Sequence, residues 1–443
     1  MASLTMVMHA ETSSPPLSVR RALVATFRGV MRLYFRDIER IGTPPPAETK
    51  GRVFVSNHQN ALIDPVLVLT DTECEISPIA KSTLWDVPGL RWLLDRAGAV
   101  PIVRKKDTPN KHAADNDATF DKIATHLAGG GNILIFPEGT SHSEPQLAPL
   151  RTGAARMLVA AEGRGGVAQT FQAVALEFDA RDDFRSRCLV LWGPVRKLSE
   201  VAGSGEDRVT AITTQMDEDL RELLVEGATH EERRLIARVA EMLANDAGDA
   251  SLAGWNTLGR QVERAGKTLR SLGPEVVQHV QAKVDAYYTE LAKYGLGDAQ
   301  LASARAAISK PGSRWLKRAM LAPLAVPGFA LYAIPYFIPR LVARRADPDA
   351  VSTIKLGTAL VVYPLWAAGL VTLSFVVVPP PLSFAAAAIA IASPFAALRW
   401  LDAYWNRTPA HEATPDALAN VARLRIVART AISEAASRLA TTG

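Results

Sequence analysis

Residues 53–69, VFVSNHQNALIDPVLVL, place a histidine and an aspartate in an otherwise apolar run, and they decide how the surrounding region folds. The β-branched residues before Ser56 predict a buried strand. Asp64 and Pro65 open the next apolar run, so we expect them at the N-cap and the first position of a helix. His58 and Asp64 would point to different faces of one regular helix, at about 100° per residue. They meet only if QNALI forms a turn between a strand and a helix.

A contact between these two side chains would have a chemical use. Asp64 would accept the Nδ1 proton of His58, fix the ring tautomer and leave Nε2 as a base toward a substrate hydroxyl. No GxSxG motif occurs, and neither cysteine lies near the pair in the sequence. The chemistry predicted is direct attack by an activated alcohol, without an enzyme-bound intermediate. The alternative is that Asp64 only caps its helix.

The region around this stretch alternates short apolar runs with helical stretches. The predicted strands are RVFVSN, GAVPIV, NILIFP, QAVALEF and CLVLWG. Helices are predicted for Leu84–Asp95 and Phe120–Leu127, and three glycines end the second one. This alternation predicts an α/β domain over residues 46–200, with a mixed sheet flanked by helices. Its functional site is expected on loops at strand ends.

Residues 1–45 are expected to form an N-terminal amphipathic helix at a membrane surface. From Leu17 to Gly42 the apolar residues recur every three or four positions, and basic residues lie away from that stripe: Arg21, Arg28, Arg32 and Arg36. Such a helix suits anionic lipid headgroups. The alternative is a helix docked on its own domain with a solvated basic face. No secretory signal peptide is predicted, because no basic segment precedes an apolar core.

Residues 201–312 are predicted to be a helical insert or connector without chemistry. THEERRLIARVAEML opens on a capping box formed by Thr229 and Glu232, and PEVVQHVQAKVDAYYTELAKY continues over several helical turns. Residues 409–443 are expected to form a C-terminal helical tail.

Residues 313–408 are predicted to associate with a membrane. No charged residue occurs from Leu356 to Leu398, and a triplet of prolines breaks this run. The first arm, Leu356–Val378, is long enough to cross a hydrocarbon core of about 30 Å, and the second, Leu382–Leu398, lies at the short limit. We therefore expect a transmembrane hairpin. A soluble core is the alternative.

A further uncharged run, Ala319–Pro339, contains prolines that disturb any straight helix. Basic residues flank it on both sides, which favours a re-entrant or interfacial segment, although a spanning helix stays open. The basic flanks of the hairpin place both of its ends on the cytoplasmic side. These patterns predict an integral protein of the cell inner membrane with its active site facing the cytoplasm.

The composition sets wider limits. The chain has 443 residues, 48% of them hydrophobic, which is enough for more than one unit, and its net charge of +5 favours an anionic partner. Cys74 and Cys188 show no CxxC or Cys/His spacing, so neither a disulfide framework nor a metal site is predicted. No nucleic-acid partner is expected, because no module of interleaved aromatic and basic residues occurs.

Two further segments can bind an anionic substrate. GAVPIVRKKD brings three cations to a strand end, where they are suited to a phosphate: Arg104, Lys105 and Lys106. NILIFPEGTSHSEPQLAPLRTG ends a strand in Glu138 and Gly139. Gly139 permits close approach of the backbone, and the next residues can donate to phosphate or glycerol oxygens: Thr140, Ser141 and His142. A solvated basic loop and an ordinary turn are the alternatives.

The segments NHQNALIDP, GAVPIVR, FPEGTSHSEPQLAPLRTGAA and QAVALEF, in this order, resemble the four blocks of the glycerophospholipid acyltransferase (PlsC-like) family over roughly residues 50–200. The resemblance implies a glycerol-3-phosphate acyltransferase-like fold. It also implies transfer of a fatty acyl group from acyl-CoA or acyl-carrier protein to the hydroxyl of glycerol 3-phosphate or lysophosphatidic acid. The acyl donor is then a co-substrate and no cofactor is expected, and membrane phospholipids are partners. FPEGTSH is more similar to the branch that acylates glycerol 3-phosphate.

The resemblance also implies roles for single residues. His58 and Asp64 would be the catalytic pair, as general base and orienting partner. The substrate-binding set would be Asn57, Arg104, Lys105, Glu138, Gly139, Thr140, Ser141, His142 and Arg151. His142 stands where the family commonly has arginine, so phosphate binding falls to Arg104, Lys105 or Arg151. Five residues rather than four separate the pair, and Ala173 replaces a common proline.

Two alternatives to glycerol 3-phosphate acylation stay open. The acceptor is lysophosphatidic acid or another lysophospholipid in the first of them. In the second, the chain is a non-catalytic lipid-binding scaffold that has kept the fold.

Overall fold

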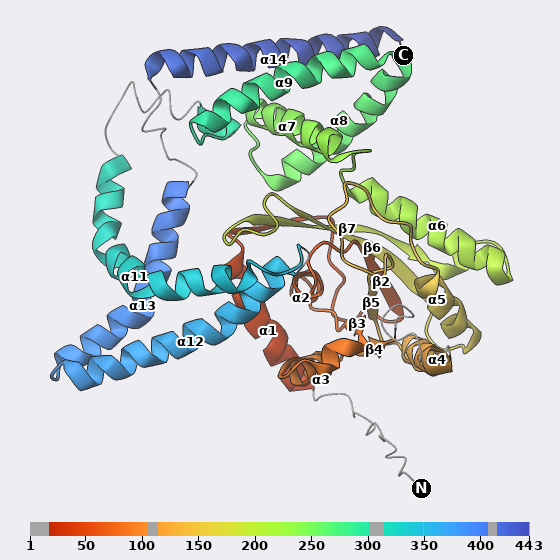
Figure 1. Cartoon of the computed structure of the whole chain (residues 1–443). Helices are drawn as coiled ribbons and strands as arrows, with labels where there is room; N and C mark the ends of the chain where they lie inside the picture. The colour runs from red at the N-terminus through yellow and green to blue at the C-terminus, as the bar shows by residue number, and fades with distance from the viewer. Residues whose placement is uncertain (1–16, 104–113, 302–313, 349, 406–413, 443) are drawn as a thin grey trace. The chain divides into compact units, whose positions relative to one another are not determined.

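The computed structural model describes residues 17–103, 114–301, 314–348, 350–405 and 414–442 (Figure 1). The chain forms two compact units. The first consists of Met1–His142, Leu147–Phe178 and Arg187–Leu224, and the second of Ser143–Gln146, Asp179–Ser186 and Val225–Gly443.

A seven-stranded sheet with the order β1-β7-β6-β2-β5-β3-β4 forms the core of the first unit. Its strands are β1 (Asp37–Ile41), β2 (Arg52–Ser56), β3 (Ser77–Lys81), β4 (Val100–Ile102), β5 (Ile133–Ile135), β6 (Thr170–Phe178) and β7 (Arg187–Lys197). Every neighbouring pair is parallel except β6 and β7, which are antiparallel. The mixed α/β sheet predicted from the sequence is therefore confirmed.

The central strands are apolar because helices cover both faces of a sheet of this kind. Val53, Phe54 and Val55 of β2 are fully buried, as the β-branched run predicted. β2 pairs in parallel with β5 and β6, so the loops that follow β2 and β5 leave the sheet at the same edge. This carboxyl edge holds the loops that carry His58 and Glu138.

The helices of the first unit are α1 (Leu17–Tyr34), α2 (Ile63–Thr70), η1 (Ser82–Asp86), α3 (Leu90–Ala97), α4 (Ala114–Ala128), α5 (Gly153–Gly163), η2 (Leu198–Glu200) and α6 (Gly205–Leu223). The single helix predicted for Leu84–Asp95 is wrong. Pro88 has no N–H to donate and Gly89 adopts a φ of +79°, so the chain forms η1 and then begins α3 afresh. The helix predicted for Phe120–Leu127 lies within α4.

The helix predicted for Leu17–Gly42 is too long. α1 ends at Tyr34, and Asp37–Ile41 form the edge strand β1, because their backbone pairs with Arg187–Leu191 of β7. The described residues 17–41 therefore contribute a helix and an edge strand to the first unit.

The last turn of α1 docks on its own domain, which was the alternative to a membrane-surface helix. Met31 and Phe35 are fully buried, and Arg28 donates from Nε to the carbonyl oxygen of Thr70 at 2.8 Å and from Nη2 to that of Thr72 at 3.1 Å. Part of the predicted basic face is thus used to hold α1 against the chain after α2.

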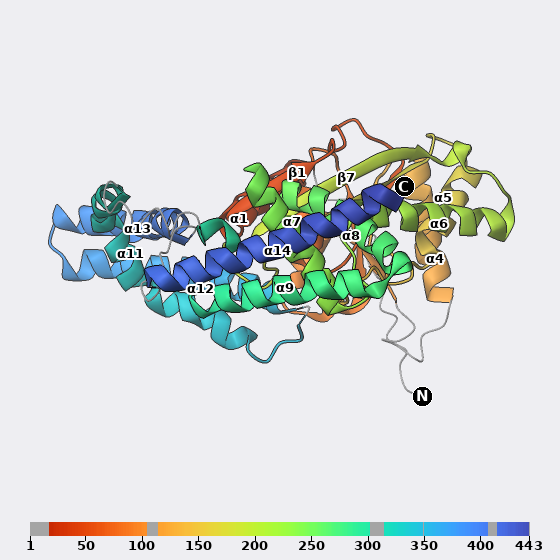
Figure 2. The ribbon, with the colours of Figure 1, turned by 90° about the horizontal axis from the view of Figure 1, so that it is seen from above.

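The second unit contains a helical bundle of α7 (His230–Ala247), α8 (Leu252–Leu272), α9 (Pro274–Lys293) and α14 (Pro415–Thr442). Figure 2 shows α14 lying alongside α9. Their apolar faces share one core that includes Val284, Tyr287 and Val421. The C-terminal tail and the connector predicted from sequence are thus parts of one bundle. The predicted boundary at residue 200 is also wrong, because α6 belongs to the first unit and the continuous part of the second begins at Val225.

The start of α7 follows the sequence prediction. Thr229 Oγ1 accepts a hydrogen bond from the backbone N–H of Glu232 at 3.1 Å, and the Glu232 carboxylate accepts one from the N–H of Ala228 at 2.9 Å. Thr229 therefore caps α7 as predicted, while the Glu232 carboxylate binds the N–H one residue before the N-cap and not that of the N-cap itself.

A buried carboxylate ties α14 to the rest of the bundle. Asp298 accepts hydrogen bonds from Arg425 at 2.7 Å, from Tyr287 at 2.5 Å and from Asn245 at 2.7 Å. Burial alone would raise the pKa of Asp298, but these donors outweigh it, with Arg425 foremost, and the pKa lies below its usual range.

Three helices of the described residues are long and apolar enough to cross a membrane: α11 (Arg314–Ala343), α12 (Val351–Val377) and α13 (Leu382–Trp405). The predicted hairpin corresponds to α12 and α13 with the proline triplet between them. α11 is one helix that includes all four prolines, and it bends in Figure 1. Its length and composition allow a span, so the re-entrant path stays a prediction.

These three helices pack on one another through small residues and single hydrogen bonds. A Cβ at Gly328 of α11 would lie 2.3 Å from the Ser393 carbonyl oxygen of α13, so only glycine permits this approach. Trp366 of α12 donates to the Leu331 carbonyl oxygen at 2.8 Å. At the start of α12, Lys355 Nζ donates to the carbonyl oxygen of Asp182 at 2.6 Å, so the segment Asp179–Ser186 is bound to the same group of helices.

Candidate active site

The structure brings His58 and Asp64 together. Nδ1 of His58 lies 3.0 Å from Oδ2 of Asp64, whose side chain is completely buried. The same oxygen accepts the backbone N–H groups of Gln59 and Asn60, each at 2.7 Å. The turn between β2 and α2 therefore wraps around the carboxylate, and this is why residues at an unfavourable helical spacing meet.

The helix starts two residues earlier than the sequence predicted. α2 begins at Ile63 with Leu62 at the N-cap, which makes no side-chain capping bond. Asp64 lies inside the first turn, and its carboxylate points back to the preceding N–H groups. It acts on the turn as a cap would, and it holds His58 as well.

The ring of His58 is fixed on a second side. It stacks on Phe136 with 4.1 Å between ring centroids and 24° between planes. The side chain is 16% exposed, and Nε2 has no hydrogen-bond partner among the described residues. With Nδ1 engaged by Asp64, Nε2 is the nitrogen left for chemistry.

Glu138 connects the two loops at the carboxyl edge. Its Oε1 accepts the backbone N–H of His58 at 2.8 Å, and its Oε2 accepts that of Ala148 at 2.9 Å. Nε2 of His142 also contacts Oε2, and the N–H of His142 donates to the carbonyl oxygen of His58 at 3.1 Å. Glu138 is 4% exposed. Both carboxylate oxygens of Glu138 thus have protein partners, and their hydrogen bonds hold the loop that carries His58.

Gly139 allows an arginine to lie against the backbone. Its φ is +76°, and a Cβ there would lie 2.6 Å from Nε of Arg151. The guanidinium of Arg151 is exposed and makes no ion pair within the described part of the chain. Arg151 is therefore a cation at the edge that holds His58, and no acid in the described residues neutralises it.

Asn57 does not present its amide to this site. Its Nδ2 donates to the carbonyl oxygen of Leu176 at 3.0 Å and its Oδ1 accepts the N–H of Leu176 at 2.8 Å, so it extends the pairing of β2 with β6. Thr140 and Ser141 are partly exposed, and the Thr140 hydroxyl donates to the Ser141 carbonyl oxygen at 3.3 Å. The other predicted cations, Arg104, Lys105 and Lys106, lie outside the described residues.

Sequence reasoning missed two contributors. Phe136 stacks on His58 from the end of β5, and Ala148 supplies a backbone donor to Glu138. Phe136 directly precedes the PEGT segment at the end of a predicted strand, and this position could have indicated that its ring lies near the site. Ala173, which replaces a common proline, is a buried residue of β6.

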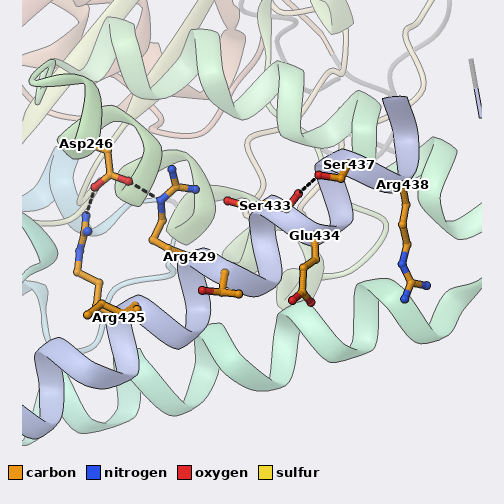
Figure 3. A pocket seen from close by; sticks show the side chains of 9 residues that line it. Asp246, Arg425, Arg429, Ser433, Glu434, Ser437 and Arg438 are labelled. Atoms are coloured by element: carbon orange, nitrogen blue, oxygen red, sulfur yellow. Dashed lines mark hydrogen bonds and ion pairs between the residues drawn. The ribbon is translucent and has the colours of Figure 1, made fainter. Parts of the chain in front are cut away.

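Neither of two surface hollows is lined by His58. One, of about 720 Å³, lies in the second unit between Asp246 of α7 and a polar face of α14 (Figure 3). Its cations Arg425 and Arg429 are both paired with Asp246. The other, of about 460 Å³, lies near Arg28 and Arg40 in the first unit.

Cys74 supplies no nucleophile. Burial raises the pKa of its thiol to about 11, so it stays protonated at neutral pH. In the described residues no group of three or more His, Cys, Asp or Glu side chains is arranged to hold a metal ion.

Known proteins are similar to part of this chain. Residues 33–174 match the Acyltransferase family model. Glycerol-3-phosphate O-acyltransferase 2 of Saccharomyces cerevisiae is 39% identical over 82 residues, which is 18% of this chain and 11% of that protein. The chloroplastic 1-acyl-sn-glycerol-3-phosphate acyltransferase BAT2 of Brassica napus is 26% identical over 121 residues, which is 27% of this chain and 33% of that protein. The chain therefore matches a third or less of the length of these relatives.

Among solved structures, the LPA acyltransferase PlsC from Thermotoga maritima is similar, with a TM-score of 0.34 and 16% identity, over 46% of this chain and 80% of that chain.

The matched region holds the central strands, the His58–Asp64 pair and Glu138. Residues 33–174 thus carry a domain similar to the Acyltransferase family.

Proposed function

We propose that this protein transfers a fatty acyl group from acyl-CoA or acyl-carrier protein to a hydroxyl of glycerol 3-phosphate, as a step of phospholipid synthesis. The observation that carries the proposal is the 3.0 Å contact between Nδ1 of His58 and the buried Asp64, which leaves Nε2 without a partner among the described residues. A base without a neighbouring nucleophile suits direct transfer to an alcohol.

The reaction uses His58 twice. Nε2 takes the proton of the acceptor hydroxyl while the oxygen attacks the carbonyl carbon of the thioester. The tetrahedral intermediate then collapses, the C–S bond breaks, and the proton on Nε2 passes to the thiolate, which leaves as a free thiol. Asp64 holds the ring in the required tautomer and stabilises the imidazolium that forms between the two steps. Such general-base assistance contributes about 10²–10⁴ in rate, and positioning of the two substrates supplies much of the rest.

Acceptor binding rests on the exposed cation at the carboxyl edge. Arg151, laid over Gly139, is suited to the phosphate of a small acceptor because a guanidinium offers paired donors to phosphate oxygens. Thr140 and Ser141 are suited to the remaining glycerol or phosphate oxygens. Arg104 and Lys105, which the sequence also predicts to bind the phosphate, would add positive charge to this site. Both lie outside the described residues.

The choice of acceptor is supported by the relatives. The yeast relative, which is 39% identical over the matched segment, is named as a glycerol-3-phosphate O-acyltransferase. A second candidate is lysophosphatidic acid, since the Brassica relative is named as a 1-acyl-sn-glycerol-3-phosphate acyltransferase. A non-catalytic scaffold is the weaker alternative, because a lipid-binding protein has no need of a histidine held on two sides with one nitrogen free.

A membrane location suits both a long acyl donor and a lipid product. The three apolar helices associate the chain with a membrane. The positive-inside rule favours a cytoplasmic position for both ends of the hairpin, because Arg344 and Arg345 precede it and Arg399 lies near its end. The active site then faces the cytoplasm, where the acceptor arrives from water, and the cell inner membrane is the location proposed.

The test is acyl transfer by the full-length protein purified in detergent. A labelled long-chain acyl-CoA is offered with glycerol 3-phosphate and with lysophosphatidic acid in parallel, and again with acyl-carrier protein as donor. His58→Ala is compared with His279→Ala, which changes an exposed histidine on α9. We expect product from glycerol 3-phosphate that is lost only in His58→Ala. Product from lysophosphatidic acid alone would select the second candidate, and equal activity of wild type and His58→Ala on both acceptors would refute the proposed reaction.

A further inference from the structure

An exposed apolar surface lies on η1 and α3 in the first unit. We call it the α3 surface and define it by Val87, Leu90, Arg91, Trp92 and Arg96. Trp92 is 55% exposed and Val87 is 46% exposed. Val87 is the extended residue that follows η1, and Trp92 lies in the first turn of α3. Large apolar side chains are normally exposed singly, so a tryptophan and a valine exposed within six residues indicate a contact surface.

The surface is held rigidly from behind. Nε1 of Trp85 in η1 donates to Oδ1 of Asp95 in α3 at 2.7 Å, which braces the two helices against each other. Asp95 also pairs with Arg91, with 3.8 Å between the nearest atoms. Asp95 of α3 is therefore bound by Trp85 and Arg91, while the side chain of Trp92 stays exposed. The exposure of Trp92 is thus a property of a fixed element and not of a loose loop.

Cations surround the apolar side chains. The guanidinium of Arg96 lies over the ring of Trp92, 4.3 Å from its centroid. Arg91 is exposed beside it. The N-terminal part of α1 lies next to α3, as Figure 1 shows, and adds the exposed Val19 and Arg21. An apolar centre with an arginine rim is complementary to an anionic lipid surface, because the rings enter the boundary region and the guanidinium groups reach phosphates.

The surface lies at the edge of the sheet that holds the candidate active site. β3 is parallel to β5, so it ends at the carboxyl edge, and η1 follows it directly at Ser82. α3 then runs back toward β4, which places its first turn, with Leu90 and Trp92, nearest that edge. A bilayer that touches this turn would lie at the same edge of the sheet as the loop that carries His58.

We propose that the α3 surface docks on the headgroup region of an anionic bilayer, with Trp92 and Val87 inserted and Arg91 and Arg96 at the lipid phosphates. This contact is additional to the three apolar helices of the second unit. It requires no turnover, so it stands whichever acceptor the enzyme uses.

The experiment uses the full chain in lipid nanodiscs made of phosphatidylglycerol and phosphatidylcholine. Trp92→Cys and, in a second protein, Val87→Cys are labelled with bimane, and nitroxide-bearing lipids are added as quenchers. The native cysteines, Cys74 and Cys188, are buried and free. Val195→Cys is the matched control, since Val195 is 46% exposed but pairs near the amino end of β6, at the opposite edge of the sheet.

We expect a nitroxide near the headgroup to quench bimane at 92 and at 87 at least about twofold more than at 195, because an interfacial element lies roughly 5–10 Å into the boundary. The difference should shrink in discs of phosphatidylcholine alone. Quenching at 92 and 87 no stronger than at 195 would overturn the proposal. So would reporters shielded from both lipid nitroxide and aqueous iodide, which would show that protein covers the surface, a second copy included.

Discussion

Replacement of Asp64 by asparagine tests the contact between His58 and Asp64, because it removes the charge of the side chain and keeps its size. Oδ2 of Asp64 accepts three N–H groups, from His58, Gln59 and Asn60. An asparagine whose oxygen takes the place of Oδ2 can still accept all three N–H groups, and its nitrogen then takes the place of Oδ1, which is buried without a hydrogen-bond partner among the described residues. The amide carries no negative charge, so it no longer stabilises the imidazolium that forms when Nε2 takes the proton of the acceptor hydroxyl, and Nε2 becomes a weaker base.

The expected loss is the general-base contribution, about 10²–10⁴ in kcat, which corresponds to roughly 2.7–5.4 kcal/mol in the barrier at about 1.36 kcal/mol for each factor of ten. Asp64→Asn, His58→Ala and the double variant are assayed for acyl transfer under saturating donor. Because both residues act through one proton transfer, the double variant should be about as slow as the slower single variant.

Asp71→Asn is the control. Asp71 is a largely buried aspartate of the same unit that accepts from Arg40 and Trp192, so its loss should lower stability and leave kcat unchanged. Wild-type kcat in a folded Asp64→Asn variant would refute the proposed role of the Asp64 charge. Multiplicative losses in the double variant would refute the coupling of the two residues.

Three further variants test other contacts. Arg151→Gln should raise KM for the phosphorylated acceptor about ten- to a hundredfold, since a charged hydrogen bond contributes about 1.5–3 kcal/mol; an unchanged KM excludes Arg151 from phosphate binding. Gly139→Ala should cost about 1–3 kcal/mol of stability at its positive φ, whereas Gly266→Ala, in open space on α8, should cost none; equal denaturation midpoints would contradict this. Asp298 has a pKa held below its usual range by Arg425 against burial, so its stabilising effect is present above about pH 4 and is lost as pH falls through the lowered pKa. Arg425→Met should destabilise the bundle by about 3–5 kcal/mol near neutral pH and flatten this acid dependence; an unchanged urea transition would oppose it.

Local patterns in the sequence were sufficient to predict an element where residues adjacent in sequence determine its conformation. The buried strand β2, the cap at Thr229 and the two arms of the apolar hairpin all follow from residues adjacent in sequence. Their signals are periodicity, a capping hydroxyl and length, which do not depend on distant partners.

Elements whose status depends on a partner were missed or misread. β1 is a strand because β7 offers it a backbone ladder, although its residues also continue the helical period of α1. β3 contains Ser77, Pro78 and Lys81, a poor strand sequence, and it is a strand because it lies between β5 and β4. Neither partner is recognisable from the segment itself.

The sequence by itself limited the ways in which His58 and Asp64 can meet, since six positions separate them and only a turn between a strand and a helix brings them together. The structure contains that turn. Only the tertiary structure decided which residues support that pair. Glu138 reaches the N–H of His58 across 80 residues, and Phe136 stacks on its ring, because β2 and β5 are parallel neighbours whose ends meet at one edge. Strand pairing is a long-range choice among many near-equal alternatives, and the free energy that decides it belongs to the packed sheet and not to either segment.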